Sequence, residues 1–94
     1  MIATFRDRDT EDFYHGTRRP GRFPSTIVKA ALRKLDMIEA AESLMDLRSP
    51  PGNRLEALRG KLDGFHSIRV NDQWRIIFKW RGTHAFEVAL VDYH

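Results

Sequence analysis

The spacing of the hydrophobic residues changes once along this chain, from a helical period in the first half to a strand alternation in the second. Apolar residues recur every three or four positions between Ile27 and Ile38, as on one face of an amphipathic helix. From Trp74 to Trp80 apolar and polar residues alternate, which is typical of a strand with one buried face. We therefore expect an α+β fold in which helices come first and an antiparallel meander follows.

Turn and capping residues divide the chain further. Asp7 or Asp9 is a suitable N-cap for a first helix, Gly16 would end it, and the prolines of 49–53 exclude a helix interior there. In chain order, the expected elements are a short strand at 2–5, helices at 9–14 and 24–42, and strands at 65–70, 74–80 and 86–90. Residues 1–94 are expected to form one domain with one small sheet.

The two faces of the expected sheet differ in chemistry. Trp74, Trp80 and the apolar residues between them would pack on the long helix. The opposite face would carry Arg69, Arg75 and Lys79. This open, basic face is either a solvated surface or a surface that meets a ligand.

Composition excludes several classes of protein. There is no cysteine, and the four histidines lack metal-ligand spacing, so we expect no disulfide, thiolate zinc site or other metal centre. No apolar run approaches the roughly 18–20 residues of a membrane span. Residues 1–10 lack the apolar core of a secretory signal. We expect a soluble, unprocessed, cytoplasmic chain.

The charge balance is mildly basic, with 16 basic against 13 acidic residues and a net charge of +3. Most of the cations are arginines, whose planar fork suits phosphate, although a codon bias toward arginine would give the same composition. Arg18, Arg19 and Arg22 form a basic loop that either contacts RNA phosphates or is simply solvated.

Three segments are more specific than a generic fold requires. They are SPPGNRLEALRG at 49–60, IRVNDQWRI at 68–76 and DYH at 92–94. Together they resemble the HigB-type toxins, the plasmid-maintenance killer proteins of the RelE superfamily. The resemblance covers nearly the whole chain. It implies a RelE-like fold and, without a cofactor, cleavage of ribosome-bound mRNA.

The resemblance also implies a partner. Such toxins are held inactive by a cognate HigA-type antitoxin with a helix-turn-helix. This chain shows no helix-turn-helix of its own. We therefore expect contact with DNA only through the toxin–antitoxin complex, and contact with the ribosome and mRNA directly.

RNA cleavage without a metal uses the 2′-hydroxyl as nucleophile, and it needs proton transfer and stabilisation of the phosphorane charge. His94 suits proton transfer because imidazole titrates near neutrality. Asp92 would orient His94 or share in proton transfer, Tyr93 would bind a phosphate oxygen or stack on a base, and Arg75 would hold the scissile phosphate. Further RNA contacts are expected from Arg59, Arg69 and Lys79.

The chain departs from some relatives before the Leu58-Arg59-Gly60 step, where they carry histidine and this sequence has Glu56. Glu56 is then either a general base, which requires a raised pKa, or a structural partner of Arg54 or Arg59. An alternative for the whole protein is a non-catalytic module that binds RNA or a partner on the same fold.

Overall fold

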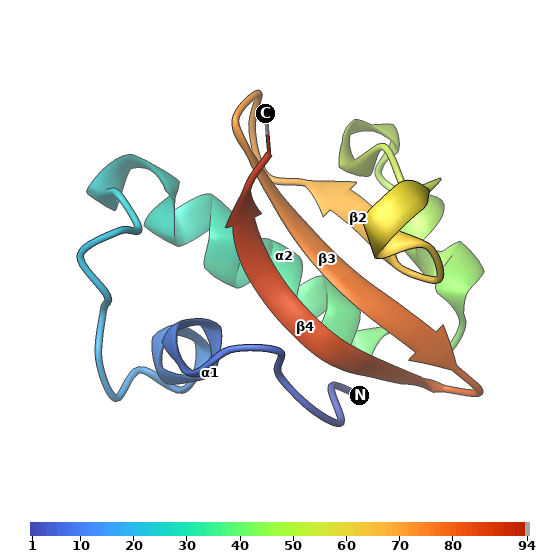
Figure 1. Cartoon of the computed structure of the whole chain (residues 1–94), viewed down its shortest axis with the longest axis horizontal. Coiled ribbons are helices and arrows are strands. Elements are labelled where there is room, and N and C mark those ends of the chain that lie inside the picture. The colour runs from blue at the N-terminus through green and yellow to red at the C-terminus, as the bar shows by residue number, and fades with distance from the viewer. Residues whose placement is uncertain (94) are drawn as a thin grey trace.

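The computed structural model describes residues 1–93, and within them two α-helices lie on one side of a four-stranded antiparallel sheet (Figure 1). The helices and strands are α1 (Arg8–His15), α2 (Val28–Ala40), β1 (Glu56–Ala57), β2 (His66–Arg69), β3 (Trp74–Arg81) and β4 (His84–Asp92). The strands follow one another in the order β1-β2-β3-β4. The predicted α+β meander is therefore confirmed.

Helix α1, Arg8–His15, is one residue longer at each end than the predicted 9–14 and lies between two of the residues predicted to bound it, Asp7 and Gly16. The carboxylate of Asp7, not that of Asp9, caps it by accepting a hydrogen bond from the Thr10 main-chain N–H at 2.7 Å. Gly16 ends it in the left-handed conformation, at φ 74°. The fully buried Thr10 hydroxyl accepts from the Leu90 N–H at 3.0 Å, which fixes α1 against β4.

Helix α2 follows a 3-10 turn at Ser25–Ile27 and ends at Ala40, two residues before the predicted end. The cause is a second capping structure. The Asp46 carboxylate accepts hydrogen bonds from the main-chain N–H groups of Glu42 and Ser43. These two residues therefore cap the start of the next 3-10 turn, Leu44–Arg48, and do not continue α2.

The main core lies between α2 and the sheet. The buried face of α2 packs on β3, where Trp74, Ile76 and Phe78 are buried as the alternation predicts. Trp80 lies at the edge of this core, partly buried, and its Nε1 donates to the Gly82 carbonyl at 2.8 Å. Burial of the alternating face thus fixes the register of the sheet against the helix.

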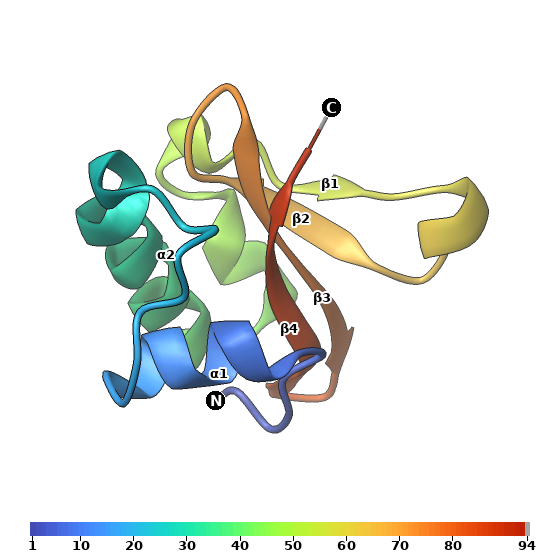
Figure 2. The same cartoon turned by 60° about the vertical axis from the view of Figure 1, so that its left-hand side comes forward.

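The opposite face of the sheet is less open than predicted. A smaller buried cluster covers part of it and consists of Leu58, Phe65, Ile77 and Ala89. The segment that supplies Leu58 and Phe65 runs through β1 and the turn at 60–62, and it projects on the side of the sheet away from α1 and α2 (Figure 2). Strand β1 was not predicted, because two residues carry no detectable alternation.

The strand predicted at 2–5 is not a regular strand. Ile2 and Phe5 form isolated parallel bridges with Ala85 and Val88 at the edge of β4. Between those two partners β4 is irregular, with Glu87 at φ 52° and a shift in its pairing to β3. Such a bulge interrupts the ladder of hydrogen bonds along an edge strand, so the N-terminal segment makes separate bridges instead of a continuous strand.

No helix within residues 1–93 is long and apolar enough to cross a membrane.

Candidate functional site

Arg75 is the best-organised cation on the outer face of the sheet, the face turned away from α2. Its Nε donates to the buried Ser67 hydroxyl on β2 at 2.8 Å, and its Nη2 donates to the Arg54 carbonyl at 2.8 Å. The Arg75 side chain is only 12% exposed. Its guanidinium is therefore preorganised rather than free in solvent.

Glu56, on β1, contacts this guanidinium. One carboxylate oxygen lies 3.4 Å from Arg75 Nη2, and the Glu56 side chain is 51% exposed. The predicted structural pairing of Glu56 with Arg54 or Arg59 is wrong, because β1 pairs with β2 and so brings Glu56 to Arg75. The carboxylate thus lies beside the cation that we expect to hold phosphate.

The end of β4 reaches the same place. The Arg75 guanidinium carbon lies 5.5 Å from the centre of the Tyr93 ring, within range of a cation–π contact. The Tyr93 ring is partly exposed, and the Asp92 carboxylate accepts from the Gln73 amide at 2.9 Å. His94, the residue expected to transfer a proton, lies outside the described residues.

The predicted RNA-contact residues have different surroundings. Arg69 forms an ion pair with Asp72, and Lys79 forms one with Glu87 at 3.1 Å. Lys79 also lies 5.1 Å from the centre of the Phe65 ring. Arg59 is exposed and precedes the turn Gly60–Leu62. Arg69 and Lys79 therefore flank Arg75 on β2 and β3, each with an acidic neighbour.

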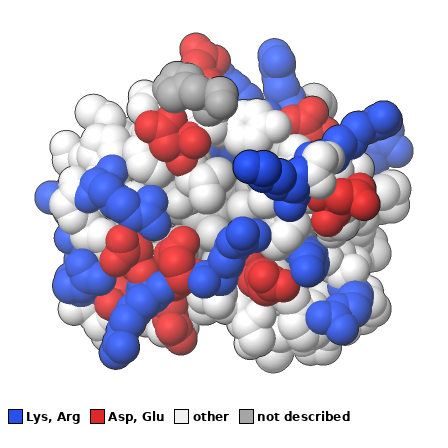
Figure 3. Space-filling view, viewed as in Figure 1, with Lys and Arg blue, Asp and Glu red and all other residues white. Residues whose placement is uncertain are grey.

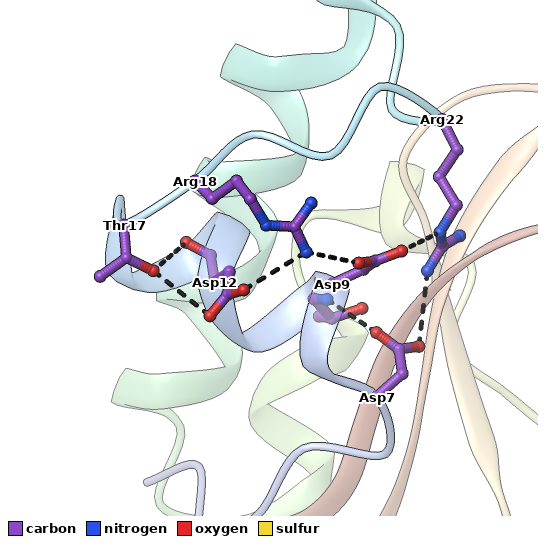
Figure 4. A network of polar contacts seen from close by, with 7 residues as sticks. Asp7, Asp9, Asp12, Thr17, Arg18 and Arg22 are labelled. Carbon is purple, nitrogen blue, oxygen red and sulfur yellow. Dashed lines mark hydrogen bonds and ion pairs between the residues drawn. The ribbon is translucent and has the colours of Figure 1, made fainter.

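The arginines of the loop after α1 are mostly engaged by acidic residues of that helix (Figure 4). Arg18 contacts Asp9 and Asp12, while Arg22 contacts Asp9 at 2.8 Å and Asp7 at 3.6 Å. Hydrogen bonds from Arg22 and Arg18 lower the pKa of Asp9. Two of the three loop cations thus stabilise the connection between α1 and α2, and this pairing leaves them less available to RNA.

Sequence reasoning missed two groups that orient Arg75. Ser67 lies on the same strand face as Arg69, so the alternation predicted that it faces outward. Nothing in the sequence indicated that its hydroxyl would bind Arg75. The Arg54 carbonyl had no sequence signal, because main-chain direction after 49–53 depends on a left-handed residue, Arg54, at φ 46°. The Ser67 contact depends on the register of β2 against β3, and the Arg54 contact joins segments 21 residues apart.

The arrangement suits the binding of a phosphate and an adjacent base. A fixed guanidinium can bind phosphate oxygens, a neighbouring aromatic ring can stack on a base, and a carboxylate can accept a proton. Within residues 1–93 no group of three or more His, Asp or Glu side chains is placed to hold a metal ion. The site is an open surface, because no pocket is found in that part of the chain.

Comparisons with known proteins find relatives over nearly the whole chain. A model of the family described as RelE-like toxin of type II toxin-antitoxin system HigB matches residues 3–94. Toxin HigB-1 of Vibrio cholerae serotype O1 is 49% identical over 80 residues, which cover 85% of this chain and 84% of that toxin.

Two solved structures share the fold at low sequence identity. The YoeB–YefM complex of Staphylococcus aureus gives a TM-score of 0.61 at 19% identity, covering 100% of this chain and 98% of that one. A YafQ mutant from Escherichia coli gives 0.65 at 12% identity, covering 98% and 93%. These likenesses concern the fold alone.

Proposed function

Because the chain belongs to the HigB-like family of RelE-like type II toxins, we propose that it is a metal-independent endoribonuclease that cuts mRNA bound to the ribosome. The observation that carries the proposal is the convergence of three side chains on the outer sheet face. Glu56, Arg75 and Tyr93 come from β1, β3 and the residue after β4, and they meet around one guanidinium. A phosphate on Arg75 would lie between a carboxylate and an aromatic ring.

In the proposed reaction the 2′-hydroxyl of the RNA attacks the adjacent phosphorus and the bond to the 5′-oxygen breaks. Glu56 takes the 2′-hydroxyl proton, and His94 gives a proton to the leaving 5′-oxygen. Arg75 stabilises the charge that grows on the phosphorane. Tyr93 stacks on a base next to the cleaved bond, and Asp92 orients His94. Neighbouring phosphates bind Arg59, Arg69 and Lys79.

Control of this activity requires a partner. Type II toxins belong to two-component systems, and one structural neighbour was solved in complex as YoeB–YefM. We propose that a HigA-type antitoxin with a helix-turn-helix binds this chain and inhibits it. The toxin would then contact DNA only within that complex.

The test compares cleavage of the same mRNA free in solution and on translating ribosomes. We expect little cleavage of free RNA, since few acid–base groups surround Arg75, and clear cleavage on ribosomes. His94→Ala should lower the single-turnover rate about 10²–10⁴-fold, the range for loss of a general acid or base. Activity should survive chelation by EDTA at levels that leave ribosomes intact.

Two results would contradict the proposal. Rapid cleavage of free RNA would exclude dependence on the ribosome. A folded His94→Ala variant that cleaves at the parent rate would remove the proposed acid. If the parent chain binds ribosomes or an antitoxin but never cleaves, the protein is instead a non-catalytic binding module on this fold.

A further inference from the structure

One contact that holds Arg75 comes from the main chain. Arg75 Nη2 donates to the Arg54 carbonyl at 2.8 Å, and Arg54 adopts the left-handed conformation at φ 46° and ψ 54°. A non-glycine residue remains in this conformation only where the surrounding structure holds it. The groups that hold Arg54 therefore also fix the guanidinium of Arg75.

The residue before Arg54 organises this segment. Asn53 is fully buried, and its Nδ2 donates to the carbonyls of Leu47 at 3.1 Å and Ser49 at 3.3 Å. Its main-chain N–H donates to the Pro50 carbonyl at 2.9 Å. One amide side chain thus closes the loop that leads into Arg54.

The remaining polar atom of the Asn53 side chain connects this loop to helix α2. Its Oδ1 accepts a hydrogen bond from the Nζ of Lys34, which is only 8% exposed. No ion pair among residues 1–93 includes Lys34, and its burial, together with the charges of Arg33 and Arg69, lowers its pKa. Burial of an ammonium without a carboxylate opposes folding. What the contact provides is a fixed orientation for Asn53.

We propose that Lys34 and Asn53 are positioning residues, which set the Arg75 guanidinium through the Arg54 carbonyl in the orientation that binds the scissile phosphate. The binding of the scissile phosphate by Arg75 rests on the proposed nuclease function. The connection has three steps. Lys34 Nζ donates to the Asn53 side chain, Asn53 is covalently joined to Arg54, and the Arg54 carbonyl accepts from Arg75 Nη2.

The first experiment needs no RNA. Exchange of the Arg75 Nη2 protons with solvent is followed by NMR at low temperature in the parent chain and in Asn53→Ala. We expect exchange about 10-fold faster in the variant, because the Arg54 carbonyl that accepts from Nη2 is no longer held in place. Lys34→Met, which keeps the buried chain length but removes the donor, should show the same change and replaces Asn53→Ala if that variant does not fold.

The second experiment is a double-mutant cycle on the single-turnover rate with ribosome-bound mRNA. Asn53→Ala should lower this rate about 10–100-fold, as misplacement of a catalytic group does, while association with ribosomes stays within about twofold. In an Arg75→Ala background the same substitution should cost less than about twofold, because the group that it positions is already absent.

The matched control is Tyr14→Phe, which also removes one side-chain hydrogen bond, here from the Tyr14 hydroxyl to Asp36, between the two helices and on the other side of the sheet from Arg75. It should lose stability and leave both Arg75 exchange and the rate of the folded protein unchanged. Unchanged Arg75 exchange in Asn53→Ala and Lys34→Met, or equal rate losses with and without Arg75, would overturn the positioning role. Absence of cleavage by the parent chain would contradict only the nuclease function. The exchange measurement would still show whether Lys34 and Asn53 hold the Arg75 guanidinium.

Discussion

At the scale of single residues, Arg75 is distinguished by its geometry more than by its charge. Two different nitrogens of its guanidinium bind Ser67 and the Arg54 carbonyl. Lysine has three N–H donors on a single nitrogen and lacks the planar fork that presents separate nitrogens to the two acceptors. We therefore expect Arg75→Lys to lose about 10²-fold in single-turnover cleavage although the charge is kept, which is the scale seen when one preorganised donor is removed.

The control for this substitution is Arg81→Lys, on the same strand, where the arginine lies over the Phe86 ring instead. That variant should cleave at nearly the parent rate. Circular dichroism should show both variants folded. An Arg75→Lys variant as active as the parent would mean that the site needs only a positive charge at this position.

Glu56 has two possible roles that one substitution separates. If it is the general base, Glu56→Gln should lower the cleavage rate about 10²–10⁴-fold, and the acid limb of the pH–rate profile should shift or vanish. If it serves only as the partner of Arg75, loss of this half-exposed pair should cost at most about 1 kcal/mol of stability. Cleavage across pH, together with denaturant melts, distinguishes the two outcomes.

The alternation of strand residues predicted where Arg75 lies, but not what holds it. A pattern with a period of two assigns a face to Arg75 and to Ser67. Their hydrogen bond, and the ion pair of Arg75 with Glu56, depend on strand register and on a two-residue strand. Sequence patterns therefore located the site more readily than they resolved its contacts.

At the scale of elements, α1 is joined to α2 by a hydrogen bond from the Tyr14 hydroxyl to Asp36 at 2.9 Å. Burial, assisted by this bond, raises the pKa of Tyr14 to about 12. A tyrosine in the unfolded chain titrates near 10. The neutral phenol therefore adds stability that is fully present below about pH 10 and is lost as the pH rises through the folded-state value.

Tyr14→Phe tests this contribution. The parent should be more stable than the variant at pH 8–9, and the difference should shrink between about pH 10 and 12. Absorbance at 295 nm should lose its most alkaline tyrosine step in the variant, in which Tyr93 is the remaining tyrosine. A stability difference that is constant up to pH 12 would contradict the assignment.

The elements that the sequence predicted well are those with long periodic patterns. Helix α2 and strand β3 have clear hydrophobic periods and lie where expected, whereas β1 is too short to show one. The N-terminal segment was predicted as a strand from its apolar character, but it makes only bridges beside the bulge at Glu87. Such irregularities depend on tertiary pairing, which local composition does not encode.

At the scale of the whole molecule, the basic composition is largely balanced locally. Basic and acidic side chains are interspersed over the face shown in Figure 3, and Arg69, Arg75 and Lys79 each have an acidic neighbour. The net charge of +3 describes a mildly basic chain. It did not predict that the cations of the outer face would be paired within the molecule, because those pairs depend on the fold.

The ion pair of Lys79 with Glu87 leads to a prediction in which removal of each partner shifts the affinity for ribosomes in the opposite direction. Lys79→Ala should weaken association with ribosomes and lower the slope of log K against log salt by about 1, as expected for the loss of one phosphate contact. Glu87→Gln should instead strengthen association, since it removes the carboxylate that lies 3.1 Å from the Lys79 ammonium and competes with phosphate. The measurement is ribosome binding over a series of salt concentrations.

Lys29→Ala is the matched control, because Lys29 is exposed on α2, on the other side of the sheet. It removes the same charge from a surface that we do not expect to face RNA. If Lys79→Ala and Lys29→Ala had equal effects, only net charge would matter for binding. A Glu87→Gln variant with unchanged affinity and salt slope would show that Lys79 does not contact a phosphate. Opposite shifts for Lys79→Ala and Glu87→Gln, with Lys29→Ala nearly neutral, would identify the outer sheet face as the surface on which RNA lies.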